Sequence, residues 1–329
     1  MKNVMEDKKA KKKRVTIYDL AKLAEVSPGT VSRVLNNRSN VSSKTRLKVL
    51  QIAQEIGLKP QVTARTKEVA VVTAPNYTDR FHGYSNVLTS HVAFSLSEQN
   101  VGMLLPPNPI KQLGEYFIDG IIAITYESEL YKMLRSLEKK MPVVYLDNFA
   151  ATEEQYVVCS DHYDSGYKAA KYFIQHGKTQ LAYIGGDVLP FRERLLGYVD
   201  AIKEAGMKPN NKLHILMPQD DSLYMAVNRV VKNNADAIFV PGCSMQAIEA
   251  LHVLTNVIGL SVPKDISIIG GENVGVSMFQ HPPLTCLDEP LEQMARAAVN
   301  MVVNLADGRE IKEKKCIFPV HLIERESVA

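Results

Sequence analysis

The chain has 329 residues, of which 46% are hydrophobic and 23% are charged, and its net charge is +3. This length is enough for two or three domains with buried cores, and the ordinary composition excludes collagen-like and wholly disordered proteins. The sequence has no run of 18 apolar residues, and no apolar segment follows the basic N-terminus. We therefore expect no membrane span, no signal peptide and a cytoplasmic location.

The four cysteines, Cys159, Cys243, Cys286 and Cys316, are scattered and show no C-x-x-C spacing. We expect them to be reduced thiols, because neither a disulfide framework nor a zinc site has this spacing. The sequence predicts no metal site and no cofactor.

The small net charge conceals two regions of opposite sign. Residues 1–68 hold 16 basic and 6 acidic residues, a balance of +10, which leaves 23 basic and 30 acidic residues, a balance of −7, in 69–329. A basic head on an acidic body indicates a polyanionic partner for the head alone. The lysine run before Val15 is also compatible with a solubilising tail.

Three short helices are predicted in the basic head. Thr16 is placed to cap the first, with Asp19 three residues later in a pattern close to a capping box. Ser27 caps the second, with Pro28 in its first turn, where the missing N–H costs nothing. Ser42 or Ser43 caps the third, which is amphipathic and ends at Gly57.

Two short helices joined by a tight turn and supported by a third form a helix-turn-helix. The second helix exposes Gly29, Ser32 and Arg33, and the Arg33 guanidinium can donate two hydrogen bonds to guanine. A generic three-helix bundle with a solvated arginine fits the same pattern, and the basic charge favours DNA binding.

From residue 69 onward, short apolar runs alternate with helical segments of 10–15 residues. This pattern predicts an α/β fold with parallel sheets covered on both faces, and about ten strands favour two lobes over one sheet. Ligands of such folds bind at the carboxyl ends of strands, here in the cleft between lobes.

Motifs of the common enzyme classes are missing from the sequence. It contains no G-x-G-x-x-G, no G-x-x-x-x-G-K-[ST], no G-x-S-x-G and no H-E-x-x-H. We therefore expect a protein that is not an enzyme.

The basic head resembles the headpiece of the lactose/galactose-repressor (LacI/GalR) family over 15–27, 29–36 and 41–46. The resemblance continues through Asp161–Gly166, Leu181–Gly186, Arg194–Tyr198 and Pro263–Gly270, so that it covers nearly the whole chain. It implies a helix-turn-helix headpiece followed by a two-lobed periplasmic-binding-protein-like core.

The resemblance also implies a division of the chain into domains. A basic tail would occupy 1–14, the DNA-binding headpiece 15–59 and a hinge 60–68, with an effector-binding and dimerisation core over 69–329. Lobe 1 would take about 69–160 and 288–316, and lobe 2 about 161–287 and 317–329. The helix near 83–99 would lie in the dimer surface.

Residue by residue, the resemblance implies a DNA-binding set of Thr16, Tyr18, Ser27, Pro28, Gly29, Thr30, Ser32, Arg33, Asn36, Ser42, Thr45, Ala64, Arg65 and Lys67. Pro28 and Gly29 occupy the two positions that vary operator choice most, and neither has a side chain that can hydrogen-bond a base. Readout of the half-site should therefore depend on Arg33 and on DNA shape.

Lys67 stands where the family usually places a leucine that wedges between base pairs. A lysine cannot enter the base stack, because its ammonium would lose its hydration there. We hypothesise that Lys67 instead meets phosphate or the minor-groove floor and that the operator is kinked less. The alternative is that the hinge is simply a linker in this protein.

The predicted effector site is Phe81, Asp161, Arg194 and Glu272, with His82 and Asp147 as further cleft groups. Arg194 matches the arginine that grips ligand oxygens, whereas Gly271 stands where an aromatic ring normally stacks and the chain has no tryptophan. Several polar partners of a sugar are thus missing. Between Met103 and Asp119 the first lobe is also about ten residues short.

Together these features predict a repressor that binds a pseudo-palindromic double-stranded DNA operator as a homodimer. A carbohydrate in the cleft, a sugar or sugar phosphate, would modulate its affinity. Two alternatives stay open: control by a protein partner or by no small ligand, and a sugar-binding module without DNA function.

Overall fold

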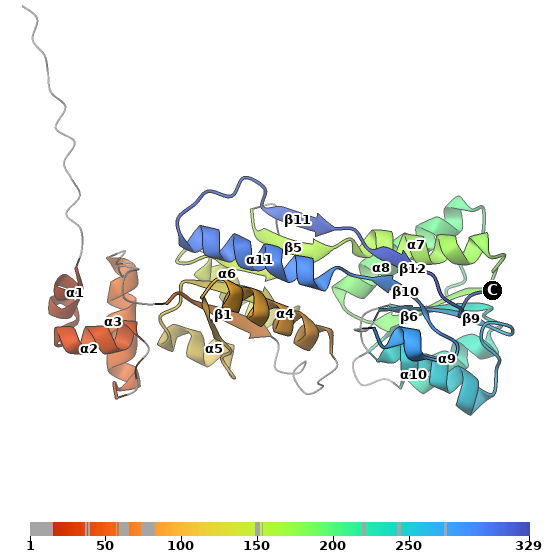
Figure 1. Cartoon of the computed structure of the whole chain (residues 1–329), viewed down its shortest axis with the longest axis horizontal. Coiled ribbons are helices and arrows are strands. Elements are labelled where there is room, and N and C mark those ends of the chain that lie inside the picture. The colour runs from red at the N-terminus through yellow and green to blue at the C-terminus, as the bar shows by residue number, and fades with distance from the viewer. Residues whose placement is uncertain are drawn as a thin grey trace, which may run out of the picture.

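The computed structural model describes residues 16–36, 38, 40–56, 58, 66–73, 83–148, 152, 154–218, 222–241, 245–272 and 275–329. Figure 1 shows a small helical headpiece followed by two α/β lobes in a row, as the family resemblance predicts. No helix among these residues is long and apolar enough to cross a membrane.

The headpiece consists of α1 (Ile17–Ala24), α2 (Pro28–Leu35) and α3 (Ser43–Glu55). Thr16 and Asp19 form the capping box at the start of α1, and the Ser27 hydroxyl accepts a hydrogen bond from Thr30 N at the start of α2. These caps satisfy N–H groups that the first turns leave unpaired. The apolar faces of the three helices meet in a small core of Leu20, Ala21, Ala24, Val31, Val34, Leu35, Val49, Leu50, Ala53 and Leu58.

Lobe 1 is built on a six-stranded parallel sheet in the order β11-β5-β4-β3-β1-β2. Its strands are β1 (Glu68–Thr73), β2 (Gly102–Leu104), β3 (Gly120–Ile124), β4 (Val143–Leu146), β5 (Tyr156–Ser160) and β11 (Lys315–Phe318). Its helices are α4 (Tyr84–Glu98), α5 (Pro109–Gln112), the 3-10 helix η2 (Leu113–Glu115), α6 (Ser128–Leu137) and α11 (Leu291–Ala306). The short α5 and η2 alone join β2 to β3.

Lobe 2 is built on a second six-stranded sheet, in the order β12-β10-β9-β8-β6-β7, in which β12 alone is antiparallel to its neighbour. Its strands are β6 (Leu181–Gly186), β7 (His214–Met217), β8 (Ala237–Val240), β9 (Ser267–Gly271), β10 (Thr285–Asp288) and β12 (His321–Ile323). Its helices are α7 (His162–Gln175), α8 (Leu189–Glu204), α9 (Leu223–Lys232), α10 (Gln246–His252), the π-helix η3 (Val253–Ile258) and the 3-10 helix η4 (Ser277–Phe279).

The chain passes between the two sheets three times, after β5, after β10 and after β11. Strand β11 runs to Phe318 and so extends slightly past the boundary predicted at 316. The chain's last residues also belong to lobe 2. The buried Ser327 hydroxyl donates to Ile268 O at 2.6 Å and accepts from Thr285 N at 2.8 Å.

Among the described cysteines, Cys159, Cys286 and Cys316 are free thiols. Burial raises the pKa of the Cys159 and Cys286 thiols to about 12 and about 11, which keeps both protonated at neutral pH. Cys243 lies outside the described residues.

Helices α7 and α8 touch backbone to backbone. A Cβ added at Gly166 would lie 1.7 Å from Arg194 O, and one added at Gly197 would lie 2.0 Å from Tyr163 O. Only glycine permits this approach, which brings the first turn of α7 against the turn of α8 that carries Arg194.

Gly166→Ala should therefore destabilise the core, because the two helices must separate to admit the methyl group. We expect the free energy of unfolding, measured by denaturant titration, to fall by about 3 kcal/mol despite the better helix propensity of alanine. The control is Gly186→Ala in β6, whose new carbon would lie 3.6 Å from Phe191 in an ordinary contact. Equal losses in the two variants would contradict the close-packing argument.

Candidate DNA interface and interlobe site

The outer face of the headpiece carries the side chains predicted to contact DNA. Tyr18 is 69% exposed, and Ser32 and Arg33 on α2 are also exposed, while Val31 and Val34 on the same helix are fully buried. Arg33 forms no ion pair with any residue that the structure describes, so its guanidinium is available to a base or a phosphate.

Several of the predicted DNA-contacting residues also cap the helices. Ser42 Oγ accepts from Thr45 N at 3.2 Å, and the Asn36 amide donates to Ser32 O at 2.7 Å. Thr16 and Ser27 cap α1 and α2, as described above. These residues are exposed or half-buried, so capping holds their hydroxyls and amides at the surface, and their contacts with DNA stay a prediction.

Three of the predicted site residues lie outside the described residues: Ala64 and Arg65 of the hinge and Phe81 of the effector site. The same holds for His82.

Lys67 belongs to lobe 1. Its ammonium lies 2.5 Å from Asp307 Oδ1 at the end of α11, and its carbonyl accepts a hydrogen bond from Gly102 N at 2.7 Å. Strand β1 begins at the next residue, Glu68. Lys67, which the family resemblance assigns to the hinge, thus directly precedes the first strand of a sheet. Contact of Lys67 with DNA would require the ion pair between Lys67 and Asp307 to break.

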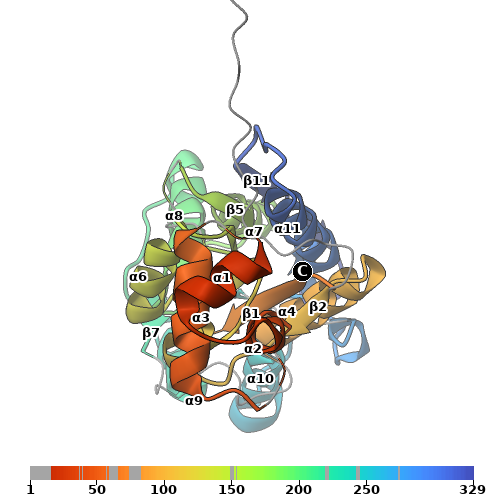
Figure 2. The ribbon, with the colours of Figure 1, turned by 90° about the vertical axis from the view of Figure 1, so that its left-hand side faces the viewer.

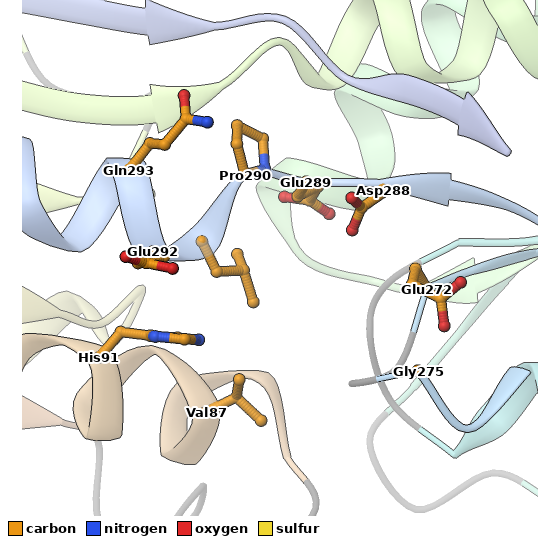
Figure 3. Close-up of a pocket in the computed structure, with 10 residues that line it drawn as sticks. Val87, His91, Glu272, Gly275, Asp288, Glu289, Pro290, Glu292 and Gln293 are labelled. Atoms are coloured by element: carbon orange, nitrogen blue, oxygen red, sulfur yellow. The ribbon is translucent and has the colours of Figure 1, made fainter.

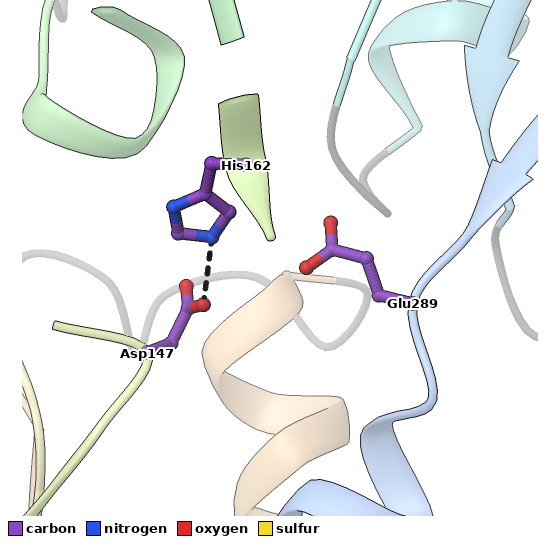
Figure 4. A group of neighbouring side chains, drawn as sticks. All are labelled: Asp147, His162 and Glu289. Carbon is purple, nitrogen blue, oxygen red and sulfur yellow. Dashed lines mark hydrogen bonds and ion pairs between the residues drawn. The ribbon is translucent and has the colours of Figure 1, made fainter. Parts of the chain in front are cut away.

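A cluster of buried polar side chains lies where the two lobes meet. Asp147 follows β4, His162 begins α7 and Glu289 follows β10, and all three are at least nine-tenths buried (Figure 4). His162 Nε2 donates to Asp147 Oδ1 at 2.9 Å, and the Tyr126 hydroxyl lies 2.5 Å from Asp147 Oδ2. Asp147 has a φ of +64°, a conformation that costs free energy in a non-glycine residue and aims its carboxylate into the cluster.

Arg194 of α8 completes the cluster by binding Glu289. Its guanidinium donates to Glu289 Oε1 at 2.5 Å, and Ser160 Oγ donates to Glu289 Oε2 at 2.6 Å. The guanidinium carbon also lies 5.6 Å from the centre of the Phe191 ring. Arg194 is only 3% exposed. The arginine predicted to grip a ligand is therefore held by a carboxylate of its own chain.

Burial and charge act in opposite directions on these groups. Burial disfavours the charged forms of both Asp147 and Arg194. The proximity of His162 and Arg194 nevertheless keeps the pKa of Asp147 below its usual value. The carboxylates of Glu289 and Asp147 likewise keep the pKa of Arg194 above the usual value of an arginine. Burial raises the pKa of the Tyr126 hydroxyl, and the nearby charge of Asp147 raises it further. We infer that the cluster holds the ionised carboxylate of Asp147 beside the Arg194 cation and the neutral phenol of Tyr126.

Asp147, His162 and Glu289 also bring possible metal ligands within 4.8 Å of one another. Each of their four carboxylate oxygens, however, already accepts a hydrogen bond from His162, Tyr126, Arg194 or Ser160. A cation would have to displace these donors, so the residues fit a self-contained hydrogen-bonded network better than a metal centre.

The other two predicted effector residues have structural partners. Asp161 caps α7 by accepting from Asp164 N at 2.9 Å, and Glu272 accepts from Arg325 at 2.5 Å. Glu289 and Ser160 were not predicted. The signal available for Glu289 was an acidic pair, Asp288 and Glu289, at the end of a buried strand and before a proline.

A cavity of about 350 Å³ opens beside this cluster, between α4 of lobe 1 and the segment after β9 in lobe 2 (Figure 3). Its wall carries His91 and several carboxylates, those of Glu272, Asp288, Glu289 and Glu292. Partial burial, with Glu272 and Glu289 nearby, raises the pKa of Asp288. The cavity is therefore a polar, acidic cleft between the lobes.

Asp288→Asn tests this electrostatic description. Because the folded protein raises this pKa above its unfolded value, the contribution of Asp288 to stability is full at low pH and is lost as pH rises through the folded pKa. The amide should therefore raise the melting temperature at pH 7, with a gain that shrinks below about pH 4. Glu292→Gln is the control, since its carboxylate lines the same cavity but pairs with Arg296. A gain of equal size at both pH values would contradict this assignment.

Comparisons with known proteins agree with this architecture. The model of bacterial regulatory proteins of the lacI family matches residues 16–61, and that of the periplasmic binding protein-like domain matches residues 170–328. The HTH-type transcriptional regulator DegA of Bacillus subtilis is 30% identical over 96% of this chain and 98% of its own length. GalR of Escherichia coli, also an HTH-type transcriptional regulator, is 30% identical over 95% of this chain and 96% of its own.

Solved structures show the same fold. The complex of the transcriptional regulator CelR with cellobiose has a TM-score of 0.71 and 29% identity, and covers 95% of this chain and 100% of its own. The lac repressor dimer bound to operator has a TM-score of 0.68 and 20% identity, and covers 96% and 100%. With its helix-turn-helix headpiece, its two-lobed core and relatives that match over nearly their full length, this chain belongs to the LacI family of transcriptional regulators.

Proposed function

We propose that this protein is a repressor that binds a pseudo-palindromic operator as a homodimer and reads each half-site with α2. The observation that carries the proposal is the capped, exposed outer face of α2, with Arg33 unpaired among the described residues. Two-fold symmetric proteins select two-fold symmetric sites, because each headpiece then meets the same half-site.

Exposed apolar side chains support the dimer. Phe94 on α4 is 64% exposed, and Met278 and Phe279 in η4 of lobe 2 are 51% and 78% exposed. Large exposed apolar groups on both lobes are typical of surfaces that another chain covers. We propose that both lobes contribute to the dimer interface.

Arg33→Ala should weaken binding to an operator selected from a random duplex pool by about 5- to 150-fold, the equivalent of about 1–3 kcal/mol for one good base contact. Binding to unrelated DNA should change much less. Lys48→Ala is the matched control, because it removes the same charge from the headpiece at a residue that pairs with Glu25. Equal losses on operator and unrelated DNA, in a fluorescence-anisotropy titration, would reduce Arg33 to a phosphate contact.

We further propose that a small polar ligand, a carbohydrate or sugar phosphate, controls operator affinity from the interlobe cavity. Arg194 does not itself line the cavity, but it binds Glu289, which does. The buried Nε of Arg194 has no hydrogen-bond acceptor among the described residues, which is rare for a buried donor and supports an added oxygen beside the cavity. Binding of such a ligand would change the angle between the lobes, and this change would alter the spacing of the headpieces.

A second candidate is a regulator that responds to a protein partner or to no small ligand. The contact between Arg194 and Glu289 favours it, because the carboxylate occupies the place of an anionic or hydroxylated ligand. The missing aromatic at Gly271 is in line with this candidate.

A thermal-shift screen of the wild type and Glu289→Gln against sugars and sugar phosphates separates the two candidates. A ligand at 100 times its Kd raises the free energy of unfolding by about 2.7 kcal/mol. A shift in the wild type supports ligand control. A shift in Glu289→Gln alone supports the second candidate, since Arg194 then binds ligand only after its own carboxylate is removed. No shift in either protein would contradict a ligand site at Arg194.

A further inference from the structure

The headpiece does not contact lobe 1 through its connecting segment alone. The Leu47 side chain on α3 lies 3.7 Å from the position of a Cβ built at Gly114 in η2, and Phe117 packs against the headpiece core. In Figure 2 the headpiece lies in front of lobe 1. We call residues 113–117 the docking segment.

The docking segment has an inner and an outer side. Leu113 is buried in the lobe 1 core and Tyr116 packs against that core, whereas Gly114 and Phe117 meet the headpiece. The segment is therefore held from within by lobe 1 while it presents an apolar surface to α3. The short connection between β2 and β3, with only α5 and η2, leaves this surface uncovered by a longer helix.

The end of the connecting segment is fixed beside this surface. Glu68 N donates to Asp119 Oδ2 at 2.8 Å, Asp119 N donates to Glu68 O at 2.8 Å, and Lys67 is tied to Asp307. Asp119 follows Phe117 closely in the chain. Only residues 59–65 separate Leu58, in the headpiece core, from Thr66. Even fully extended, that length spans roughly 28 Å, so the headpiece stays at high effective concentration near its docking segment.

Docking leaves the DNA-reading face free. Helix α3 contributes Val49, Leu50 and Ala53 to the headpiece core and Leu47 to the lobe contact. Arg33 on α2 stays exposed. The docked arrangement is thus compatible with DNA binding and would present the reading face in a fixed orientation.

Strand β3 joins the docking segment to the interlobe cluster. It begins at Gly120, is buried along its whole length and ends at Ile124. Tyr126, which contacts Asp147, lies two residues after its end. One short buried strand therefore has the headpiece contact at one end and the cleft at the other.

We propose that residues 113–117 are a docking surface for the chain's own headpiece and that this contact, in addition to the hinge, couples lobe 1 to operator binding. The coupling part rests on the proposed function, whereas docking itself does not. If this contact is lost, the headpiece becomes ordered only when it binds DNA. The free-energy cost of that ordering would lower the apparent affinity for the operator.

The test compares Leu47→Asp and Leu47→Ser with Leu23→Asp. Leu47 and Leu23 are exposed to similar extents, 45% and 54%, and neither belongs to the headpiece core, so all three variants should fold. Leu23→Asp adds the same charge to the same domain away from the docking segment. Leu47→Ser removes the apolar contact without adding a charge that could repel DNA.

Docking is measured first, without DNA. Because the chain has no tryptophan, Phe117→Trp introduces a single tryptophan at the contact, whose emission can be excited apart from that of the tyrosines. In this background both Leu47 variants should shift the emission to the red, and hydrogen exchange should accelerate in 43–55 and 113–119, while Leu23→Asp changes neither. Unchanged emission and exchange in the Leu47 variants would overturn the docking surface.

Operator affinity is measured second, on the selected duplex. Both Leu47 variants should bind it about tenfold more weakly than Leu23→Asp, the equivalent of about 1.4 kcal/mol. Equal affinities in variants that have lost docking would overturn the coupling. A wild type that binds no DNA would instead overturn the proposed function, and the fluorescence and exchange results would still decide whether the headpiece docks.

Discussion

The ion pair between Arg194 and Glu289 is the interaction on which the arrangement of the core depends. The two sheets share no strand, and Glu289 lies on a segment that passes from one to the other. Through its two oxygens this carboxylate joins Arg194 of lobe 2 to Ser160 at the end of a lobe 1 strand. Removing one member of a buried pair typically costs about 3–5 kcal/mol, because the other charge is left without a partner. The glycine contact between α7 and α8 brings Arg194 within reach of Glu289. The ion pair therefore depends on the close packing of the two helix backbones.

The features that could be predicted from sequence are those encoded by neighbouring residues. The capping box of Thr16 and Asp19, the Ser27 cap and the alternation of apolar strands with helices involve residues a few positions apart, and the structure contains all of them. Arg194 was expected at the cleft from its place in a family pattern. Its partner Glu289 is 95 positions away, and nothing in the sequence around either residue indicates that the two meet. Pairings of this kind are set by tertiary packing, which short patterns do not contain.

Lys67 shows the same limit at a domain boundary. Matching the hinge outward from the headpiece placed this lysine among DNA-contacting residues, whereas the structure places it at the start of a sheet. The groups that fix it there, Gly102 and Asp307, come from distant parts of the chain, and Asp119 fixes the next residue, Glu68. Lys67 and Glu68, the last two residues of the predicted hinge, are thus bonded to lobe 1. The contact between α3 and residues 113–117 is a second link between headpiece and core.

The order of strands has a consequence for synthesis of the protein. Both sheets need strands from the last part of the chain, β11 for lobe 1 and β12 for lobe 2, and the hydroxyl of Ser327 joins two segments of lobe 2. The headpiece core, by contrast, is complete once Leu58 has been made. On a ribosome, where domains fold as they emerge, a DNA-binding headpiece would therefore form long before either lobe. A nascent regulator would then pass through a stage in which it has a DNA-reading surface but no completed core to control it.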